Sequence, residues 1–194
     1  MSEREVGLRA RLVAAGVELV LREGQSAVSL REIARRAGVS HGAPRRYFPT
    51  HLDLLSAIAR EGFTDLTGRV EQTLRAAGPD PRARLTALGR TYLDFAAAHR
   101  GMFELMFRHD LLASSRLGLR EKSLPLFAVL VDLVAQVRRP TDAAVPVLAG
   151  ALWANLHGIA QLWAWGSLPL ATGVDEDDAL LRAALDAHLG PAPA

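Results

Sequence analysis

The sequence predicts an all-α protein. Alanine and leucine, which both favour helices, fill 65 of the 194 positions. Aromatic residues make up only 6% of the chain, and β-branched residues are sparse, which argues against a β-sandwich or barrel. Apolar residues recur at steps of three and four, and glycine and proline divide this pattern into about nine helices.

The first helix is expected to run from the N-terminus to about Glu23. Ser2 and Glu5 have the spacing of a capping box at its start, and Gly24 follows its end. The apolar residues of this segment share one helix face because they step by four, three and four: Leu8, Leu12, Ala15 and Leu19.

Two short helices joined by a tight turn are expected next. Ser29 and Glu32 form a second capping box, and the helix that they open ends at Gly38, which supplies the left-handed backbone of the turn. Ser40 can cap the following helix, from about His41 to Tyr47. This is the layout of a helix-turn-helix, whose second helix enters the major groove of DNA.

The rest of the chain predicts six further helices. Thr50 caps the first of them, with Asp53 in its first turn, where a carboxylate suits the helix dipole. Residues 166–173 are expected to form a loop, and the acidic run 175–178 opens the last helix. The expected ranges are about 51–77, 85–95, 102–107, 124–137 (ended by Pro140), 143–165 and 179–189.

Charge is divided unevenly along the chain, although the net charge is only +2. Residues 1–60 hold ten arginines and six acidic residues, a net charge of +4, whereas residues 61–194 have a net charge of −2. A basic segment of this kind is typical of nucleic-acid binders, but taken alone it is more often a solvated arginine face. The sequence is therefore divided into a basic domain that contains the helix-turn-helix, 1–60, and a second domain, 61–194.

Several classes of function find no support in the sequence. The absence of cysteine excludes disulfides, thiol nucleophiles and cysteine-ligated metals. The six histidines lack paired metal-ligand spacing, and neither a Gly-x-Ser-x-Gly motif nor a phosphate loop is found. The N-terminus also lacks the apolar core of a signal peptide. We therefore expect a cytoplasmic protein that is not an enzyme and that has no cofactor and no metal.

An uncharged stretch covers residues 143–174. It exceeds the roughly 20 residues that a membrane span requires, so a membrane helix is one interpretation. However, Asn155, His157 and Gln161 lie in its middle, and prolines and glycines interrupt it. A helix buried on most of its faces inside an assembly of copies is therefore favoured, and no membrane partner is expected.

Residues 4–60 resemble the N-terminal domain of the TetR family of transcriptional regulators. The features that carry this resemblance are the first helix ending at Gly24 and, in order, 29–34 (SLREIA), 37–40 (AGVS) and 47–49 (YFP). Less strongly, Trp153, His157 and Gly158, after the segment 101–107, resemble one branch of TetR ligand domains. The resemblance implies an all-helical two-fold homodimer. Its three-helix head, the DNA-binding domain 1–60, binds a double-stranded DNA operator, and the helical bundle 61–194 is the ligand-binding and dimerisation domain.

The DNA-binding prediction centres on Arg45 and Arg46. One of them reads guanine through O6 and N7 while the other neutralises a phosphate, or both are plain surface arginines, and their roles stay interchangeable. Tyr47 either donates to phosphate or packs on the first helix. The resemblance places backbone contacts at the start of the helix 29–36, whereas Pro44, Arg45 and His51 depart from the family's usual residues. The predicted set is Ser29, Arg31, Ser40, His41, Gly42, Ala43, Arg45, Arg46, Tyr47 and His51.

Apolar and aromatic residues of the second domain can enclose an apolar or aromatic ligand, or can form an ordinary core. His157 either contacts that ligand or hydrogen-bonds between helices. The predicted ligand residues are Phe63, Leu66, Tyr92, Phe103, Met106, Phe107, Phe127, Leu130, Trp153, His157 and Gln161. The predicted dimer residues are Trp163, Trp165, Leu180, Leu181, Ala184, Leu185 and His188.

These observations favour a repressor that a small apolar or aromatic ligand releases from its operator. The alternative is an orphan DNA-binding or architectural dimer without a small-molecule effector. A ligand that stabilises the protein and frees DNA would distinguish the first from the second, because ligand binding shifts an equilibrium only when it favours one state.

Overall fold

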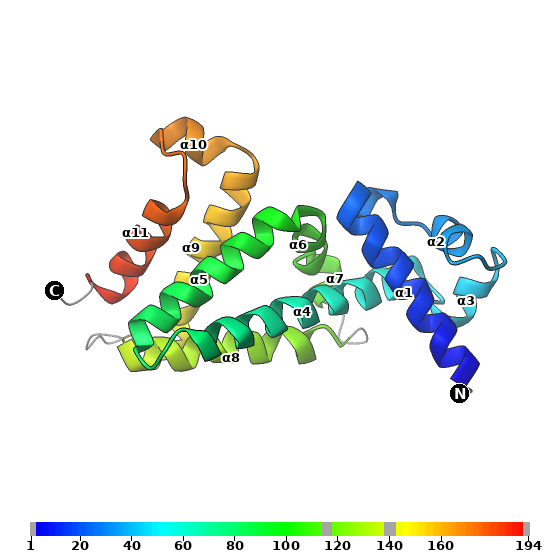
Figure 1. Cartoon of the computed structure of the whole chain (residues 1–194), viewed down its shortest axis with the longest axis horizontal. Helices are drawn as coiled ribbons and strands as arrows, with labels where there is room; N and C mark the ends of the chain where they lie inside the picture. The colour runs from blue at the N-terminus through cyan, green and yellow to red at the C-terminus, as the bar shows by residue number, and fades with distance from the viewer. Residues whose placement is uncertain (1–2, 114–117, 138–142, 192–194) are drawn as a thin grey trace. The chain divides into compact units, whose positions relative to one another are not determined.

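The computed structural model describes residues 3–113, 118–137 and 143–191. These ranges contain eleven α-helices, one short 3-10 helix and no strand, so the protein is all-α as predicted (Figure 1). The chain divides into two compact units, the first formed by Met1–Asp65 with His99–Ser123 and the second by Leu66–Ala98 with Leu124–Ala194. The predicted boundary near residue 60 thus lies close to the first division, but the segment from His99 joins the N-terminal unit.

The first unit is organised around α1 (Glu3–Glu23), which contacts the short helix η1 (Gln25–Ala27), α2, α3 and α6. Of its predicted apolar stripe, Leu12 and Leu19 are fully buried, whereas Leu8 and Ala15 are half-buried. Ile33 and Phe48 are also buried in this unit. The other helices of the unit are α2 (Leu30–Arg36), α3 (Ala43–Tyr47), the first part of α4 (His51–Ala76), α6 (Arg100–Met106) and α7 (His109–Ala113).

A close backbone approach joins α6 to the end of α1. A Cβ atom added to Gly101 would lie 2.8 Å from the carbonyl oxygen of Val20 and 3.1 Å from the Cα atom of Gly24. Neither atom can move without moving the backbone, so glycine is required at position 101. This contact places α6 in the same compact unit as the N-terminal helices.

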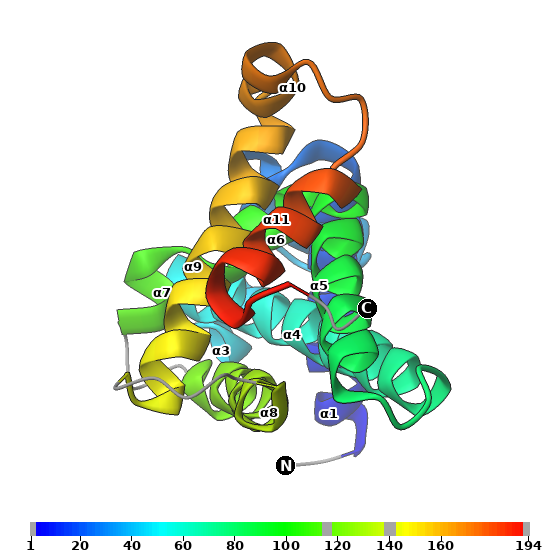
Figure 2. The same ribbon diagram turned by 90° about the vertical axis from the view of Figure 1, so that its left-hand side faces the viewer.

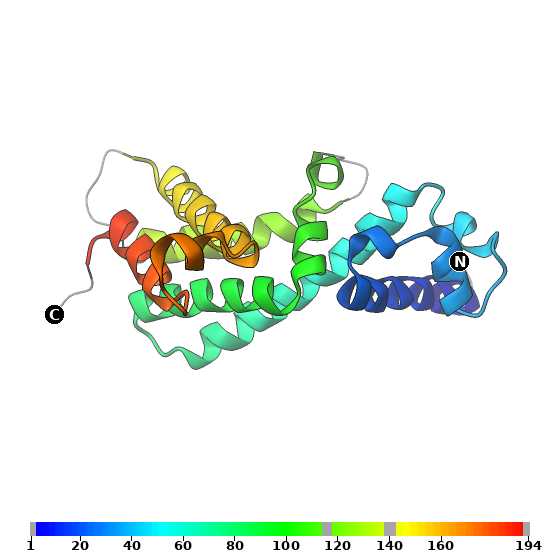
Figure 3. The ribbon, with the colours of Figure 1, turned by 90° about the horizontal axis from the view of Figure 1, so that it is seen from above.

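The second unit contains the remaining helices and the second part of α4. Its helices are α5 (Pro81–Ala98), most of α8 (Arg120–Val137), α9 (Val145–Ala164), α10 (Ser167–Thr172) and α11 (Asp178–Leu189). Helix α11 lies beside both α5 and α9 (Figure 2 and Figure 3). Arg90 of α5 pairs with Asp177 and Asp178 at the start of α11, and Arg82 donates to Asp186 at 2.6 Å. These ion pairs join the two helices around their apolar contact.

Two segments that the sequence analysis left as loops are helical. Helix α7 occupies the expected loop after residue 107, and α10 occupies most of the expected loop at 166–173. Gly166 and Gly173 flank α10 with left-handed backbone, φ +73° and +70°, so the glycines end this short helix on each side rather than preventing it. With these two short helices the described residues contain eleven α-helices, whereas about nine were expected.

Helix boundaries differ from expectation at two prolines. Helix α3 begins at Ala43 rather than His41, because Pro44 takes a place in its first turn, where a missing N–H costs no helical bond. Helix α8 begins at Arg120, so Pro125 lies inside it rather than at its start. The predicted Ser2–Glu5 capping box and the stop at Pro140 lie outside the described residues and side chains.

Candidate nucleic-acid interface and ligand-domain clusters

Both ends of α2 are held by the residues that the sequence indicated. The Ser29 hydroxyl accepts the backbone N–H of Glu32 at 3.1 Å, which caps the start of the helix. At the other end Gly38 has φ +66°, and Val39 donates its N–H to the carbonyl of Ala34 at 3.0 Å. This pattern is a Schellman motif, which fixes the direction in which the chain leaves α2 toward α3.

The residues of helix α3 divide between a buried side and an exposed side. Pro44 is buried, whereas Arg45 and Arg46 are exposed and Tyr47 is half-buried. Ser40 contributes only its carbonyl, which accepts the Ala43 N–H at 3.0 Å, so the predicted side-chain cap by Ser40 is wrong. The helix packs on α1 and α2, and the two arginines stay exposed within the unit.

Two arginines of α1, which the sequence analysis did not single out, support the helix-turn-helix. Arg11 donates from Nη2 to the carbonyl of Ala37 at 2.6 Å, at the C-terminal end of α2, where a cation suits the helix dipole. The Arg9 guanidinium lies 5.3 Å from the ring centroid of Phe48. Both arginines are sequence neighbours of the apolar residues of α1, and this position could have indicated that they lie close to α2 and α3.

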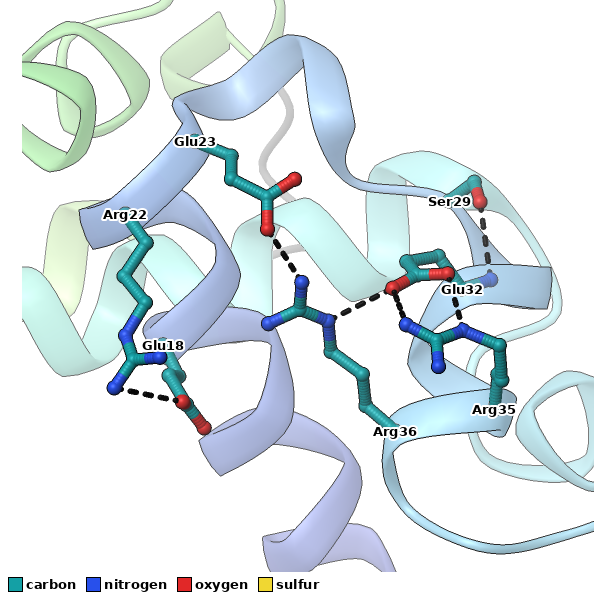
Figure 4. Close-up of polar contacts among 7 residues, drawn as sticks. All are labelled: Glu18, Arg22, Glu23, Ser29, Glu32, Arg35 and Arg36. Carbon is teal, nitrogen blue, oxygen red and sulfur yellow. Dashed lines mark hydrogen bonds and ion pairs between the residues drawn. The ribbon is translucent and has the colours of Figure 1, made fainter.

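Glu32 is the acceptor for both arginines in the last turn of α2 (Figure 4). Arg35 donates to it from Nε at 2.9 Å and from Nη2 at 2.6 Å, and Arg36 donates from Nε at 2.8 Å. Arg36 also pairs with Glu23 at the end of α1. The hydrogen bonds from Arg35 and then Arg36 lower the pKa of the Glu32 carboxyl to about 2, so this group is ionised at neutral pH.

Three other arginines of the same helices have no such partner. Arg31, Arg45 and Arg46 are exposed and form no hydrogen bond or ion pair with another residue in the described part of the chain. A guanidinium left unpaired on a helix-turn-helix is available for phosphate oxygens or for the acceptors of guanine. The structure therefore leaves the predicted arginines without a partner, whereas Arg35 and Arg36 are paired.

The remaining predicted DNA-binding residues lie on the same surface segments. Ser29, Ser40, His41 and Gly42 are exposed, and Ala43 is half-buried. His51 is committed elsewhere, because its Nε2 lies 2.8 Å from the carbonyl oxygen of Val28 and must donate to it. The phosphate contact of His51 stays a prediction.

The predicted ligand residues fall into two groups, one in each compact unit. In the first unit the Phe107 ring lies 5.6 Å from Phe63 in an edge-to-face arrangement and 4.9 Å from Phe103. Gly62 of α4 lets the sulfur atom of Met106 approach, since a Cβ atom at position 62 would lie 2.6 Å from it. Phe63, Phe103 and Met106 are buried, as in a packed aromatic core.

In the second unit, three polar side chains are linked between α5 and α9. Trp153 donates from Nε1 to the Tyr92 hydroxyl at 3.2 Å, and this hydroxyl lies 2.8 Å from Nδ1 of His157. Burial raises the pKa of Tyr92 and lowers the pKa of His157, so both are neutral at neutral pH. The hydroxyl accepts from the indole, so its own proton is donated to Nδ1. His157 thus forms the bond between helices that was one of its two predicted roles.

The other predicted ligand residues of this unit are buried to different degrees. The Phe127 ring meets Trp153 edge-on at 6.1 Å between centroids. Leu66 and Leu130 are buried, whereas Gln161 is half-buried. Ligand contact by any of these residues stays a prediction.

A hollow of about 350 Å³ lies between α9, α10 and α11. Asn155 is the polar side chain of its lining, and Gly158 contributes backbone. The apolar side chains of the lining are those of Ile159, Leu162, Leu168, Leu180, Ala183 and Ala184. Of the predicted dimer residues, Leu180 and Ala184 line this hollow, Trp165 is 62% exposed, and Trp163 and His188 are half-buried.

Leu181 and Leu185, which were also expected at a dimer interface, are each only 2% exposed within the chain. A Cβ atom on Gly89 of α5 would lie 2.7 Å from Cδ1 of Leu181, so this leucine packs against α5. The two leucines therefore belong to the core of the protomer itself. Helical periodicity identifies an apolar face but does not tell which helix covers it.

Comparison with known proteins assigns both units. Residues 12–58 match the family model described as bacterial regulatory proteins, tetR family, and residues 85–188 match the tetracyclin repressor-like C-terminal domain. The chain belongs to the TetR family. It is therefore a DNA-binding transcriptional regulator and not an enzyme.

Individual TetR-family relatives agree with this assignment. The HTH-type transcriptional activator FasR of Mycolicibacterium smegmatis is 30% identical over 114 residues, 59% of this chain and 52% of FasR. The chain spans about half the length, or less, of the curated relatives it matches. Among solved structures, a protein of unknown function from Rhodococcus sp. RHA1 is 33% identical with a TM-score of 0.78, covering 94% of this chain and 93% of that one.

The multidrug binding protein EbrR, solved with imidazole, is 28% identical with a TM-score of 0.66, covering 100% of this chain and 96% of EbrR. Helix α9 is long and apolar enough to cross a membrane, although a single helix of this kind is weak support for such a role. Because α9 lies within the matched C-terminal domain, it is a helix of the regulator rather than a membrane span.

Proposed function

We propose that this TetR-family protein is a homodimeric repressor that a small apolar or aromatic ligand releases from its operator. The observation that carries the DNA-binding part is the trio of exposed, unpaired arginines on α2 and α3, Arg31, Arg45 and Arg46. In a helix-turn-helix the second helix enters the major groove and the first crosses the backbone, so Arg45 and Arg46 meet bases or phosphate while Arg31 meets phosphate.

Exposed apolar residues support the homodimer. On α9 and α10, Leu162 is 39%, Trp165 is 62% and Leu170 is 89% exposed in the single chain. Apolar residues of this size beside an apolar hollow are typical of a contact with another molecule. A two-fold pair presents two heads to DNA half-sites about one helical turn apart, or a multiple of it, which makes the operator pseudo-palindromic.

The uncharged cluster of the second unit supports a ligand without formal charge. Tyr92, Trp153 and His157 are uncharged and hydrogen-bonded to one another, and the ring of Phe127 meets Trp153. Such a site suits an apolar or aromatic molecule that a few hydrogen bonds orient. EbrR, whose name describes a multidrug binding protein, adds support for a small-molecule effector. For the release of DNA, the ligand must bind the free form more tightly than the operator-bound form.

Selection of bound DNA from a random pool of duplexes tests the first part of the proposal. We expect one palindromic sequence, and we expect the Arg45→Ala/Arg46→Ala double variant to lose its binding while remaining helical and dimeric. An unchanged affinity of this variant in a shift assay would contradict the assignment of α3. The Arg22→Ala variant, which removes an exposed arginine of α1, is the matched control and should bind the selected duplex normally.

A thermal-shift screen of uncharged aromatic compounds tests the ligand. A compound that raises the melting temperature and also frees the selected duplex supports a ligand-controlled regulator. Compounds that stabilise the protein without affecting DNA, or no hit at all, favour an orphan DNA-binding dimer. Transcription from a template that carries the operator decides between repressor and activator, and we expect the protein to lower it. We expect this action in the cytoplasm.

A further inference from the structure

The C-terminal turn of α2 carries a charge cluster that is electrically neutral. We define the α2 charge cluster as Glu23, Glu32, Arg35 and Arg36, which are connected by ion pairs in this structure (Figure 4). Two carboxylates balance two guanidinium groups, so the cluster adds no net charge to the helix-turn-helix. The basic character of α2 and α3 therefore comes from Arg31, Arg45 and Arg46 alone.

Glu32 is what holds Arg35 in this cluster. The Arg35 side chain is 67% exposed, so burial does not fix it, and both of its hydrogen bonds go to the two oxygens of Glu32. This two-point contact uses Nε and Nη2, the edge of the guanidinium that would otherwise bind a phosphate in the same manner. Arg36 differs because its side chain is only 22% exposed and a second carboxylate, Glu23, also holds it.

Free arginines on α2 would act on every DNA sequence alike. The first helix of a helix-turn-helix crosses the DNA backbone, and contacts with phosphate strengthen binding without regard to sequence. Base contacts from α3 carry the sequence information. An additional phosphate contact would thus tighten non-specific binding, and the large excess of non-specific sites in a genome would then hold more of the protein.

We infer that Glu32 withholds Arg35 from the DNA phosphates and so keeps the sequence-independent part of DNA binding, and with it binding to non-specific DNA, weak. This inference rests on the proposed DNA-binding function of α2 and α3. Loss of the Glu32 charge frees only Arg35, because Glu23 retains Arg36. The cluster therefore limits the number of phosphate contacts that each head can make.

The test is the salt dependence of binding to a non-specific duplex and to the selected operator, measured with the full-length protein. In Glu32→Gln, each head gains one free arginine. We expect the slope of log K against log salt to steepen by about 0.9 per head, about 2 for the dimer, and non-specific binding to tighten by about tenfold at roughly 0.1 M salt. The ratio of operator to non-specific affinity should fall or stay unchanged, but not rise.

Glu18→Gln is the matched control. It makes the same change in net charge and breaks an exposed ion pair, Glu18–Arg22, but that pair lies on α1 outside the helix-turn-helix (Figure 4). We expect its salt slope to equal that of the wild type. Equal slopes for Glu32→Gln and Glu18→Gln would overturn the inference, because the effect would then come from net charge rather than from Arg35.

Arg35→Gln keeps the inference testable even if Glu32→Gln folds poorly. It should leave the slope unchanged, because Arg35 is already neutralised. Where Glu32→Gln folds, Glu32→Gln/Arg35→Gln should return the slope to the wild-type value. A slope that falls by about 1 per head in Arg35→Gln would show that Arg35 reaches phosphate despite Glu32, and the inference would be wrong. Failure of the proposed function itself looks different, since the wild type would then select no duplex.

Discussion

The polar groups on α2 and α3 differ from those between α5 and α9 in how many of their hydrogen bonds are made within the protein. On α2 and α3, guanidinium groups lie at the surface, and three of them have no partner among the described residues. Between α5 and α9, Trp153, Tyr92 and His157 are neutral and donate to one another in sequence. A charged group can stay unpaired only in contact with water, whereas a buried polar group must be paired within the protein.

This difference indicates how each region can meet a partner. The arginines exchange water and counterions for DNA phosphates, so their binding depends strongly on salt. A ligand near Tyr92 must either leave its bonds intact or replace them, because an unmade bond at a buried hydroxyl costs about 1–3 kcal/mol. The arginines of the first region are thus already free to bind DNA, whereas the Tyr92 hydroxyl of the second region has its hydrogen bonds without a ligand.

The largest expected effect comes from removing the apolar support of the charged region. Phe48 is 1% exposed, and Arg9 stacks on its ring. Phe48→Ala should lower the free energy of unfolding by about 3–5 kcal/mol, as for other buried aromatic residues truncated to alanine. Chemical denaturation measures this loss. Leu52→Ala, at a 40% exposed position of α4, is the control and should cost much less; similar losses for both would mean that Phe48 does not anchor the head.

The second effect tests the satisfied region. Tyr92→Phe removes the hydroxyl that links Trp153 to His157 and leaves both partners without it, so we expect a loss of about 1–3 kcal/mol in thermal or chemical unfolding. Tyr47→Phe, at a half-buried position of α3, should change stability by no more than about 0.5 kcal/mol. If Tyr92→Phe is neutral while it alters ligand affinity, the hydroxyl serves the ligand rather than the fold.

A smaller effect separates the two predicted helix caps. Ser29→Ala should cost about 1 kcal/mol, because the hydroxyl accepts the N–H of Glu32, whereas Ser40→Ala should cost much less since Ser40 caps no helix with its side chain. Urea denaturation of the two variants gives the comparison. Equal losses would show that the hydroxyl of Ser40 contributes to stability in a way that its structure does not explain.

The sequence was sufficient to predict much of this fold because its signals are local. Caps, glycines and apolar steps of three and four determine α1, α2, α4 and α11 within a few residues. Segments without such periodicity were less predictable: α7 and α10 are one or two turns long, and too few residues contribute to an apolar face. The assignment of 99–123 to the first unit depends on the contact of Gly101 with α1, which no local pattern records.

The candidate sites show the same limit. The sequence identified Arg45 and Arg46 as DNA-binding candidates, and the structure exposes both. The spacing of Glu32 from Arg35 and Arg36, three and four residues, was an available signal for their pairing that the sequence analysis did not use. The contribution of Glu23 could not be predicted, because Glu23 lies on another helix. In the same way, the apolar stripe of α11 did not distinguish Leu181, which packs on α5, from Leu180, which lines the hollow.

The smallest effect is the pH dependence of the charged region. The Glu32 pKa is about 2 in the folded protein against an ordinary value of 4.5, so between these values the unfolded chain binds the proton more readily. The stabilisation by Glu32 is therefore fully present above pH 4.5 and is lost as the pH falls toward 2. Melting temperatures of the wild type should decline more steeply in this interval than those of Glu32→Gln.

Salt tests the origin of this pH dependence. Glu32 is accessible to solvent, so its ion pairs with Arg35 and Arg36 are screened, and about 1 M NaCl should bring the two pH profiles closer together. The linked neutral cluster between α5 and α9 should respond less to salt, because its bonds are between uncharged groups. A difference between the profiles that persists at high salt would mean that Glu32 acts through packing of α2 rather than through its charge, and the contrast between the two clusters would then be smaller than their geometry indicates.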